Sequence, residues 1–309
     1  MKGLSKVSVK LVEIDSETAG QRVDNFLLKV CKGVPKSHIY RILRSGEVRV
    51  NSGRVDATYK LKDGDRVRIP PLRLGAKAAP SKPPAFDLPI VYEDEGLIAA
   101  NKPAGLAVHG GSGISYGVIE QLRLARPQAK FLELVHRLDR DTSGLLLLAK
   151  KRSVLTAMHE LIRTGQMDKR YLALVQGQWP VGKQHVKLKL QRYVTGGGER
   201  RVSVDDEGQE AHTVFDLERA CGDYSLLQAQ LKTGRTHQIR VHLSHLGFPI
   251  VGDDKYGDFE RNKRLAKLGL KRMFLHAWKL AFVHPLSGDR LKLEAPLPRE
   301  LENFISTPK

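Results

Sequence analysis

The sequence predicts an α+β protein with a small N-terminal domain and a larger second domain. Two helix patterns and several short strand patterns fall within residues 20–70. A proline-rich, basic segment at residues 72–86 then interrupts the apolar pattern, as expected of a linker. Strand-like and helix-like segments alternate in the remainder of the chain. We therefore expect an N-terminal domain over residues 1–71 with its core in 20–70, a linker over 72–86, and a second domain over 87–309.

The composition predicts a folded protein with a polyanionic partner. The chain has 309 residues, of which 41% are hydrophobic and 28% charged, and its formal net charge is +18. This charge favours nucleic acid or an anionic membrane surface as the partner. A membrane is the weaker alternative, because the chain has no run of 18 apolar residues and its N-terminus lacks the apolar core of a signal peptide. The only cysteines, Cys31 and Cys221, argue against a disulfide framework, so we expect a cytoplasmic location.

The N-terminal domain is expected to combine two short helices with a small β-hairpin region. Apolar residues at helical spacing predict helices at 21–30 and 38–44, with Ser37 as the N-cap of the second helix and Gly46 at its end. Strand patterns are present at 5–14, 48–50, 60–61 and 66–69. A turn at Asp63-Gly64-Asp65 is expected to join the last two strands as a pair.

The same domain carries basic side chains at Lys36, Arg41, Arg44 and Arg49. A run of charge is often only a solvated face. However, the domain resembles the small RNA-binding domain first recognised in a ribosomal small-subunit protein. The resemblance rests on Arg22-Val23-Asp24, Pro35-Lys36-Ser37, Arg41, Gly46, Val48-Arg49-Val50-Asn51 and Gly64-Asp65. It implies that Lys36, Arg41, Arg44 and Arg49 bind RNA.

In the second domain, a charge-dense segment at residues 136–144 runs directly into the apolar residues 145–149. The apolar run predicts a buried strand, and the charged residues before it predict a rigidly held loop that faces a cleft. Further strands are expected at 88–92, 97–100, 171–175 and 226–231, helices at 118–124 and 155–163, and a hairpin that contacts a partner within 183–210.

Two carboxylates in the charged loop, Asp139 and Asp141, invite comparison with the paired carboxylates of glycosidases. Arg137 and Arg140 are close in sequence, and nearby cations favour an ionised carboxylate. An ionised carboxylate suits a nucleophile or a base better than an acid. Local charge alone nevertheless favours a structural Asp–Arg pair.

Two further features are open to more than one interpretation. The glycine-rich segment at 101–113 lacks the Gly-Lys-Ser/Thr ending of a phosphate-binding loop, so a turn after a strand is the favoured interpretation. Tyr171 lies on a predicted strand, where it is either a core aromatic residue or a ring that stacks on a base.

Residues 233–245 contain three histidines and two arginines, which are His237, His242, His245, Arg235 and Arg240. On a helix, His237 would point away from the other two histidines, which argues against a metal site. The two arginines are better interpreted as partners of phosphate, or of a carboxylate such as Asp139.

The segments together resemble the RNA pseudouridine synthases that act on large-subunit ribosomal RNA. The resemblance rests on Asn101-Lys102-Pro103, Val108-His109, His136-Arg137-Leu138-Asp139, Thr142-Ser143-Gly144, Lys169-Arg170-Tyr171 and residues 234–242. It implies a mixed, largely antiparallel sheet flanked by helices. It also implies isomerisation of uridine to its carbon-linked form in large-subunit ribosomal RNA, without cofactor or metal, by a protein that we expect to be a monomer.

The resemblance also implies roles for individual residues. Asp139 would be the essential carboxylate, and Arg240 would pair with it. Tyr171 would stack on the target base, and Arg137 would fill the space left when the uridine is flipped out of its stack. The expected substrate contacts also include Lys102 and Arg235. Two alternatives stay open: a non-catalytic RNA-binding assembly factor, and a glycosidase or nucleosidase that uses Asp139 with Asp141.

Overall fold

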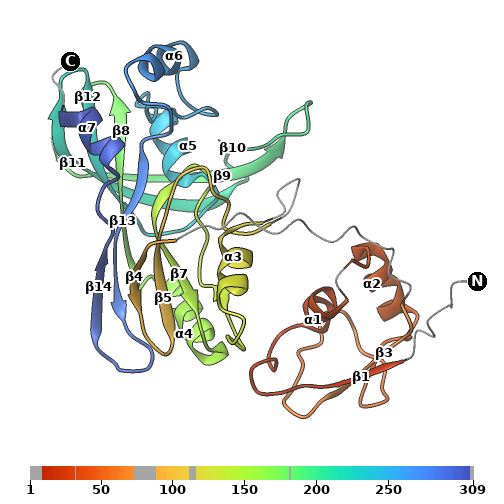
Figure 1. Cartoon of the computed structure of the whole chain (residues 1–309). Helices are drawn as coiled ribbons and strands as arrows, with labels where there is room; N and C mark the ends of the chain where they lie inside the picture. The colour runs from red at the N-terminus through yellow and green to blue at the C-terminus, as the bar shows by residue number, and fades with distance from the viewer. Residues whose placement is uncertain (1–8, 32, 73–87, 111–115, 181, 307–309) are drawn as a thin grey trace, which may run out of the picture. The chain divides into compact units, whose positions relative to one another are not determined.

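The computed structural model describes the chain except for residues 1–8, 32, 73–87, 111–115, 181 and 307–309 (Figure 1). The chain divides into two compact units, residues 1–82 and 83–309. All but one residue of the expected linker, 72–86, lies outside the described residues, as does part of the glycine-rich segment at 101–113. Within the described residues, no helix is long and apolar enough to cross a membrane.

The N-terminal unit packs two helices on a three-stranded sheet. Its elements are β1 (Lys10–Glu13), α1 (Val23–Val30), α2 (Lys36–Arg44), β2 (Arg49–Val50) and β3 (Arg66–Ile69). The strand order is β1-β3-β2, with antiparallel neighbours. Both helices are amphipathic, and Phe26, Leu27, Ile39 and Ile42 face the strands in one buried cluster.

Two predictions for this unit were wrong in detail. Ser37 lies inside α2 and not at its N-cap, because the helix already begins at Lys36, directly after Pro35. Residues 60–61 do not pair with β3, because β1 and β2 occupy both edges of that strand. Lys60 instead forms an isolated bridge with Arg22.

The second unit is dominated by one large sheet. Its strands are β4 (Ile90–Glu93), β5 (Leu97–Lys102), β6 (Glu133–Leu134), β7 (Ser143–Ala149), β8 (Asp168–Gln176), β9 (Gln184–Val194), β10 (Arg200–Val204), β11 (Gln209–Cys221), β12 (Tyr224–Leu231), β13 (Leu275–Val283) and β14 (Arg290–Glu294). Its helices are α3 (Val118–Ala125), α4 (Arg152–Arg163), α5 (Gln238–His245), α6 (Phe259–Lys267) and α7 (Arg299–Ser306).

The sheet has the order β10-β9-β11-β12-β8-β13-β7-β5-β4, with β14 paired to β13 and β6 paired to β7. Among the described strand pairs, only β13 and β7 run parallel. The α+β class and the mixed, largely antiparallel sheet are thus confirmed. The hairpin expected within 183–210 is formed by β9 and β10.

Strand β7 lies in the middle of the core, as its unbroken apolar run predicted. All seven of its residues are buried. Leu145 and Leu147 face a cluster that includes α4, whereas Leu146 and Leu148 face a cluster that includes α3 (Figure 1). Because helices cover both faces, the strand needs no polar alternation. A strand fixed on both faces is a rigid support for the charged loop that precedes it.

Gly144 allows this loop to approach the neighbouring strand closely. Its φ is +107°, and a Cβ at this position would lie 2.2 Å from the carbonyl oxygen of Ala277 on β13. Neither the conformation nor the space admits another residue. The glycine therefore determines where the chain leaves the loop of Asp139 and enters the sheet.

Candidate active site

Asp139, Tyr171 and Arg240 are far apart in sequence but line one cavity of about 610 Å³ in the second unit. Asp139 lies in the loop before β7, Tyr171 on β8 and Arg240 on α5. Arg137 and Arg235 line the same cavity, whereas Lys102 does not. The structure thus brings together five of the six residues predicted for catalysis or substrate binding in this unit.

The loop of Asp139 is anchored at its end by Ser143. Nη2 of Arg272 donates to the Ser143 hydroxyl oxygen at 2.7 Å, and the hydroxyl lies 2.8 Å from Nδ1 of His276. The hydroxyl proton is therefore available to Nδ1, and Nε2–H of His276 can donate to the carbonyl of Ala295 at 3.1 Å. Burial lowers the pKa of His276 to about 4, so the ring is neutral at pH 7 and matches this arrangement.

Lys102 anchors the same loop from inside the protein. Its side chain is fully buried, and its ammonium donates to the carbonyl oxygens of Pro103, Leu106 and Arg140 at 2.8–2.9 Å. Burial lowers the pKa of Lys102 to about 7. Three backbone carbonyls thus use its three donor positions, and the substrate contact expected of Lys102 stays a prediction. Lys102 therefore holds the backbone of the loop at Arg140.

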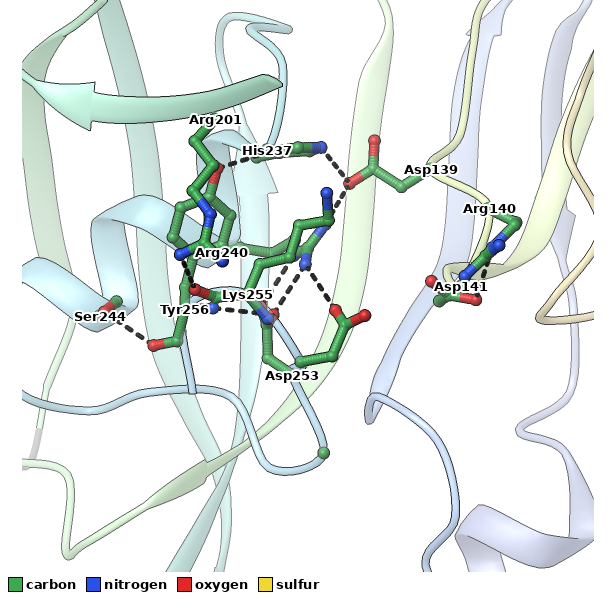
Figure 2. Close-up of polar contacts among 12 residues, drawn as sticks. Asp139, Arg140, Asp141, Arg201, His237, Arg240, Ser244, Asp253, Lys255 and Tyr256 are labelled. Carbon is green, nitrogen blue, oxygen red and sulfur yellow. Dashed lines mark hydrogen bonds and ion pairs between the residues drawn. The ribbon is translucent and has the colours of Figure 1, made fainter. Parts of the chain in front are cut away.

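Arg240 joins two carboxylates at the site (Figure 2). Its Nε and Nη2 donate to the two oxygens of Asp253, each at 2.7 Å, and its Nη1 donates to Oδ2 of Asp139 at 3.2 Å. Burial acts to lower the pKa of Arg240, but the hydrogen bonds and charge of Asp253, and then the charge of Asp139, outweigh it and raise the pKa. Arg240 is therefore a permanent cation with a fixed orientation.

Asp253 is fixed as firmly as the arginine that it holds. Its side chain is buried, and its Oδ1 also accepts the backbone N–H groups of Lys255 and Tyr256 at 2.9 and 3.1 Å. Burial acts to raise the pKa of Asp253, but Arg240 and these N–H groups lower it. Sequence reasoning did not identify Asp253 as a partner of Arg240. The sequence did show Gly252 next to Asp253, and glycine is favoured where a turn needs a positive φ. In the structure the φ of Gly252 is +77°.

His237 approaches Asp139 from another side. Its Nε2 lies 3.9 Å from Oδ2 of Asp139, and its Nδ1 lies 2.8 Å from the hydroxyl of Tyr256 (Figure 2). That hydroxyl accepts the Val202 N–H at 3.0 Å, which leaves its own proton for Nδ1 of His237. Burial lowers the pKa of His237, against the opposing charge of Asp139. A neutral ring in this tautomer points its Nε2–H toward Asp139.

The backbone at His237 is in the left-handed region, with φ +53°, which a non-glycine residue adopts rarely. Gln238 stabilises this turn. Its amide nitrogen donates to Thr213 and to the carbonyl of His212, and its amide oxygen accepts from Thr233 and from the Arg235 N–H, all at 2.8–3.0 Å. The turn therefore sets the direction of the Arg235 and His237 side chains.

The cation that contacts Asp139 is not one of the two that the sequence suggested. Arg137 and Arg140 form no ion pair with Asp139 in the described part of the chain, and Arg140 instead contacts Asp141 at 3.3 Å (Figure 2). Neighbours on a loop point in different directions, so closeness in sequence did not give closeness in space. Arg240, which the resemblance named as the partner, supplies the contact across the fold.

Tyr171 places its phenol group in the cavity with its ring largely buried, at 7% exposure. Burial raises the pKa of Tyr171 above its usual value, and the charge of Asp139 raises it further. The hydroxyl is therefore protonated at neutral pH and can act only as a neutral donor or acceptor. The ring remains available as an apolar surface for a base.

Basic side chains surround the cavity. Arg137 and Arg235 are exposed, and Arg235 donates to the backbone carbonyl of Glu210 at 3.0 Å. Lys169 and Arg192 also line the cavity, although the sequence assigned neither of them a role in the site. Arg192 belongs to β9, within the segment expected to form a hairpin that contacts a partner. The cavity thus combines one accessible carboxylate with several cations, a combination suited to an anionic substrate.

The residues expected to bind RNA in the N-terminal unit lie on or beside α2. Lys36, Arg41 and Arg44 are exposed on the helix, away from the buried Ile39 and Ile42. Arg49 is half-buried and donates to the carbonyl of Ser52 at 3.1 Å. In neither unit do the described residues contain three or more histidine, cysteine or acidic side chains placed to hold a metal ion.

Comparison with known families gives matches in both units. The family model described as S4 domain matches residues 21–67, and the one described as RNA pseudouridylate synthase matches residues 96–245. Among solved structures, human RNA pseudouridylate synthase domain containing 1 has a TM-score of 0.59 and 26% identity, over 72% of this chain and 90% of its own. Human RNA pseudouridylate synthase domain containing 4 has a TM-score of 0.56 and 28% identity, over 70% and 91%.

Three curated relatives, each named ribosomal large subunit pseudouridine synthase C, match over almost the whole chain. The protein of Pasteurella multocida (strain Pm70) is 51% identical, over 96% of this chain and 93% of its own length. The protein of Yersinia pestis is 52% identical over 96% and 95%, and that of Escherichia coli (strain K12) is 51% identical over 96% of both. The chain therefore belongs to the RNA pseudouridine synthase family, whose enzymes isomerise uridine in RNA.

Proposed function

We propose that this isomerase acts on specific uridines of large-subunit ribosomal RNA and that Asp139 is its essential carboxylate. The observation that carries the proposal is the setting of Asp139, whose carboxylate lies in a cavity with a basic rim and is oriented by Arg240. The curated relatives are named for the large ribosomal subunit, which supports the same class of substrate here.

The contacts of Asp139 leave one of its oxygens free for the reaction. Arg240 and His237 both approach Oδ2, and Oδ1 has no donor among the described residues. In the reaction the bond from the ribose to the base nitrogen breaks, the base turns, and a carbon–carbon bond forms. Oδ1 is the atom that we assign to attack on sugar or base, or to abstraction of a sugar proton, while Oδ2 stays bound to Arg240.

The other residues of the cavity handle the substrate. Tyr171 stacks on the target base, and its neutral hydroxyl assists removal of the proton at the new carbon linkage by hydrogen bonding. A base within a helix cannot turn, so a helical target must be flipped out, and Arg137 fills the space that the uridine leaves. Arg235 contacts the RNA backbone at the rim of the cavity.

The N-terminal unit contributes affinity for RNA. Lys36, Arg41, Arg44 and Arg49 contact phosphates, which gives binding that depends on salt but not on sequence. The second unit then selects the uridine. The enzyme acts as a monomer in the cytoplasm, a location that fits its two free cysteines and its ribosomal substrate.

The decisive experiment maps pseudouridines in ribosomal RNA from cells with and without this protein. The proposal predicts that specific large-subunit positions are lost without the protein and restored by purified enzyme. Unchanged maps would disprove the ribosomal target. Release of free uracil from the RNA would instead support the nucleosidase alternative.

The role of Asp139 is tested with Asp139→Asn, which keeps the size of the side chain and an oxygen for Arg240. We expect this variant to form no pseudouridine while it retains RNA binding, measured by filter binding on the same transcript. Activity equal to that of the unaltered enzyme would remove Asp139 from the mechanism. Equal loss of activity and binding would favour an RNA-docking role.

A further inference from the structure

The loop that carries Asp139 separates the proposed uridine cavity from a second cavity of about 830 Å³. Leu138 and Asp139 line the first cavity, and Arg140 and Asp141 line the second. Asp254, which contacts Arg240 at 3.5 Å, also lines the second cavity. The two cavities are therefore neighbours across one short, firmly anchored segment of chain.

The second cavity has an apolar part and a charged rim. Pro89, Pro103, Ala104, Met273, Leu297 and Pro298 provide flat or compact apolar surface. Its volume is within the range of about 300–1,000 Å³ that is usual for small-molecule sites. Apolar surface can pack against the face of a base without selecting one hydrogen-bonding pattern.

The charges of this cavity do not cancel. Asp141 contacts Arg140 at 3.3 Å, and Glu300 contacts Arg272 at 3.2 Å. The third carboxylate, Asp254, lies 3.5 Å from Arg240, which also binds Asp253 and Asp139. Lys271 and Arg299 also line the cavity, and both are exposed. Neither forms an ion pair with any residue that the structure describes.

We propose that this second cavity binds a nucleotide that flanks the target uridine, with its base against the apolar surface and a phosphate at Lys271 and Arg299. The inference rests on the proposed function of the Asp139 cavity. A uridine that enters that cavity brings its neighbours in the RNA with it, and the second cavity begins on the other side of the same loop. An apolar surface beside two uncompensated cations complements a base beside a phosphate.

The test uses the double variant Lys271→Ala/Arg299→Ala and a short RNA that spans a uridine modified by the unaltered enzyme. We expect kcat/KM for pseudouridine formation to fall roughly tenfold, and the slope of affinity against salt to become shallower by about one to two. The matched control is Arg264→Ala/Lys267→Ala on α6, which removes the same charge from exposed positions outside the cavity. The control variant should retain kcat/KM within about twofold.

Contact with a particular phosphate is identified by replacing each phosphate next to the target with a neutral methylphosphonate, one at a time. At the bound position, the neutral linkage should lower kcat/KM of the unaltered enzyme and leave kcat/KM of the double variant unchanged. The reason is that the neutral linkage and the double substitution remove the same interaction. An abasic nucleotide at the flanking position should lower kcat/KM in both proteins.

The inference would be overturned if the cavity variant and the α6 control lost the same fraction of kcat/KM. It would also be overturned if the neutral linkage lowered kcat/KM equally in the unaltered enzyme and in the double variant. Failure of the unaltered enzyme to modify any ribosomal uridine would instead count against the proposed function. The two failures are therefore distinguishable.

Discussion

Two arginines lie near Asp139, one beside it in the loop and one across the fold, and they show what burial does to an ion pair. Arg240 is 4% exposed and binds Asp253 through two hydrogen bonds of 2.7 Å, whereas the side chain of Arg140 is 57% exposed and contacts Asp141 at 3.3 Å. A buried, bidentate pair fixes the position of a charge, but an exposed pair contributes about 0–1 kcal/mol and is mobile. The charge density of the loop is therefore a poor guide to which charges matter.

The largest effect is expected from Asp253→Asn, which leaves the buried guanidinium of Arg240 without its main partner. Loss of one member of a buried pair typically costs about 3–5 kcal/mol, so the free energy of unfolding should fall by that order. Displacement of Arg240 should also lower the single-turnover rate on the order of 10²-fold. Chemical denaturation and rapid-quench kinetics measure the two effects.

Asp253→Glu serves as the companion variant, because it keeps the charge but shifts it by one methylene. We expect it to recover much of the stability and less of the rate, since the rate depends on the geometry at Asp139. Equal recovery of both would mean that Asp253 is only structural. If Asp253→Asn had the same single-turnover rate as the unaltered enzyme, the buried pair would matter no more for catalysis than the exposed pair.

The next effect concerns His276, which anchors the loop through Ser143. The pKa of His276 is about 4 in the folded protein, below its ordinary value of 6.5. Between these values the unfolded chain binds a proton that the folded protein does not, so this group lowers the free energy of unfolding as pH falls from about 6.5 to about 4. The slope has an upper limit of about 1.4 kcal/mol per pH unit.

His276→Gln removes the titrating ring, and we expect a less steep loss of stability over the same pH window. His136 and His242 have pKa values lowered to about 4 as well, so the slope should decrease without vanishing. Urea denaturation at several pH values measures it. Identical slopes in the variant and the unaltered protein would show that His276 does not act through its neutral form.

Much of the fold followed from the sequence because periodicity reports burial directly. The run at 145–149 became a strand buried on both faces, and the spacing at 155–163 became the greater part of α4. The active-site partners were harder to predict, since Arg240 meets Asp139 and Asp253 only through tertiary structure. Arg140 was assigned wrongly for the same reason. The burial of Lys102 against backbone carbonyls was also not predicted, because a sequence does not show which way a side chain points.

A smaller effect is expected from Arg41→Ala/Arg44→Ala on α2. These exposed arginines differ from Arg140 in that their proposed partner is RNA phosphate rather than a carboxylate of the same chain. We expect KM to rise roughly tenfold, kcat to stay within about twofold, and the salt dependence of binding to weaken. Steady-state kinetics at two salt concentrations measure these quantities. A change confined to kcat would contradict a docking role.

The smallest effect is expected from Asp141→Asn, the matched change to the exposed pair. The Asp141 side chain is 34% exposed and its partner Arg140 is 57% exposed, so the free energy of unfolding should change by less than about 0.5 kcal/mol. Single-turnover pseudouridine formation at saturating RNA should stay within about twofold. A mechanism with two paired carboxylates would instead require Asp141 and lose activity as severely as with Asp139→Asn. Such a loss would show that the exposed pair of Arg140 and Asp141 matters as much for catalysis as the contact between Arg240 and Asp139.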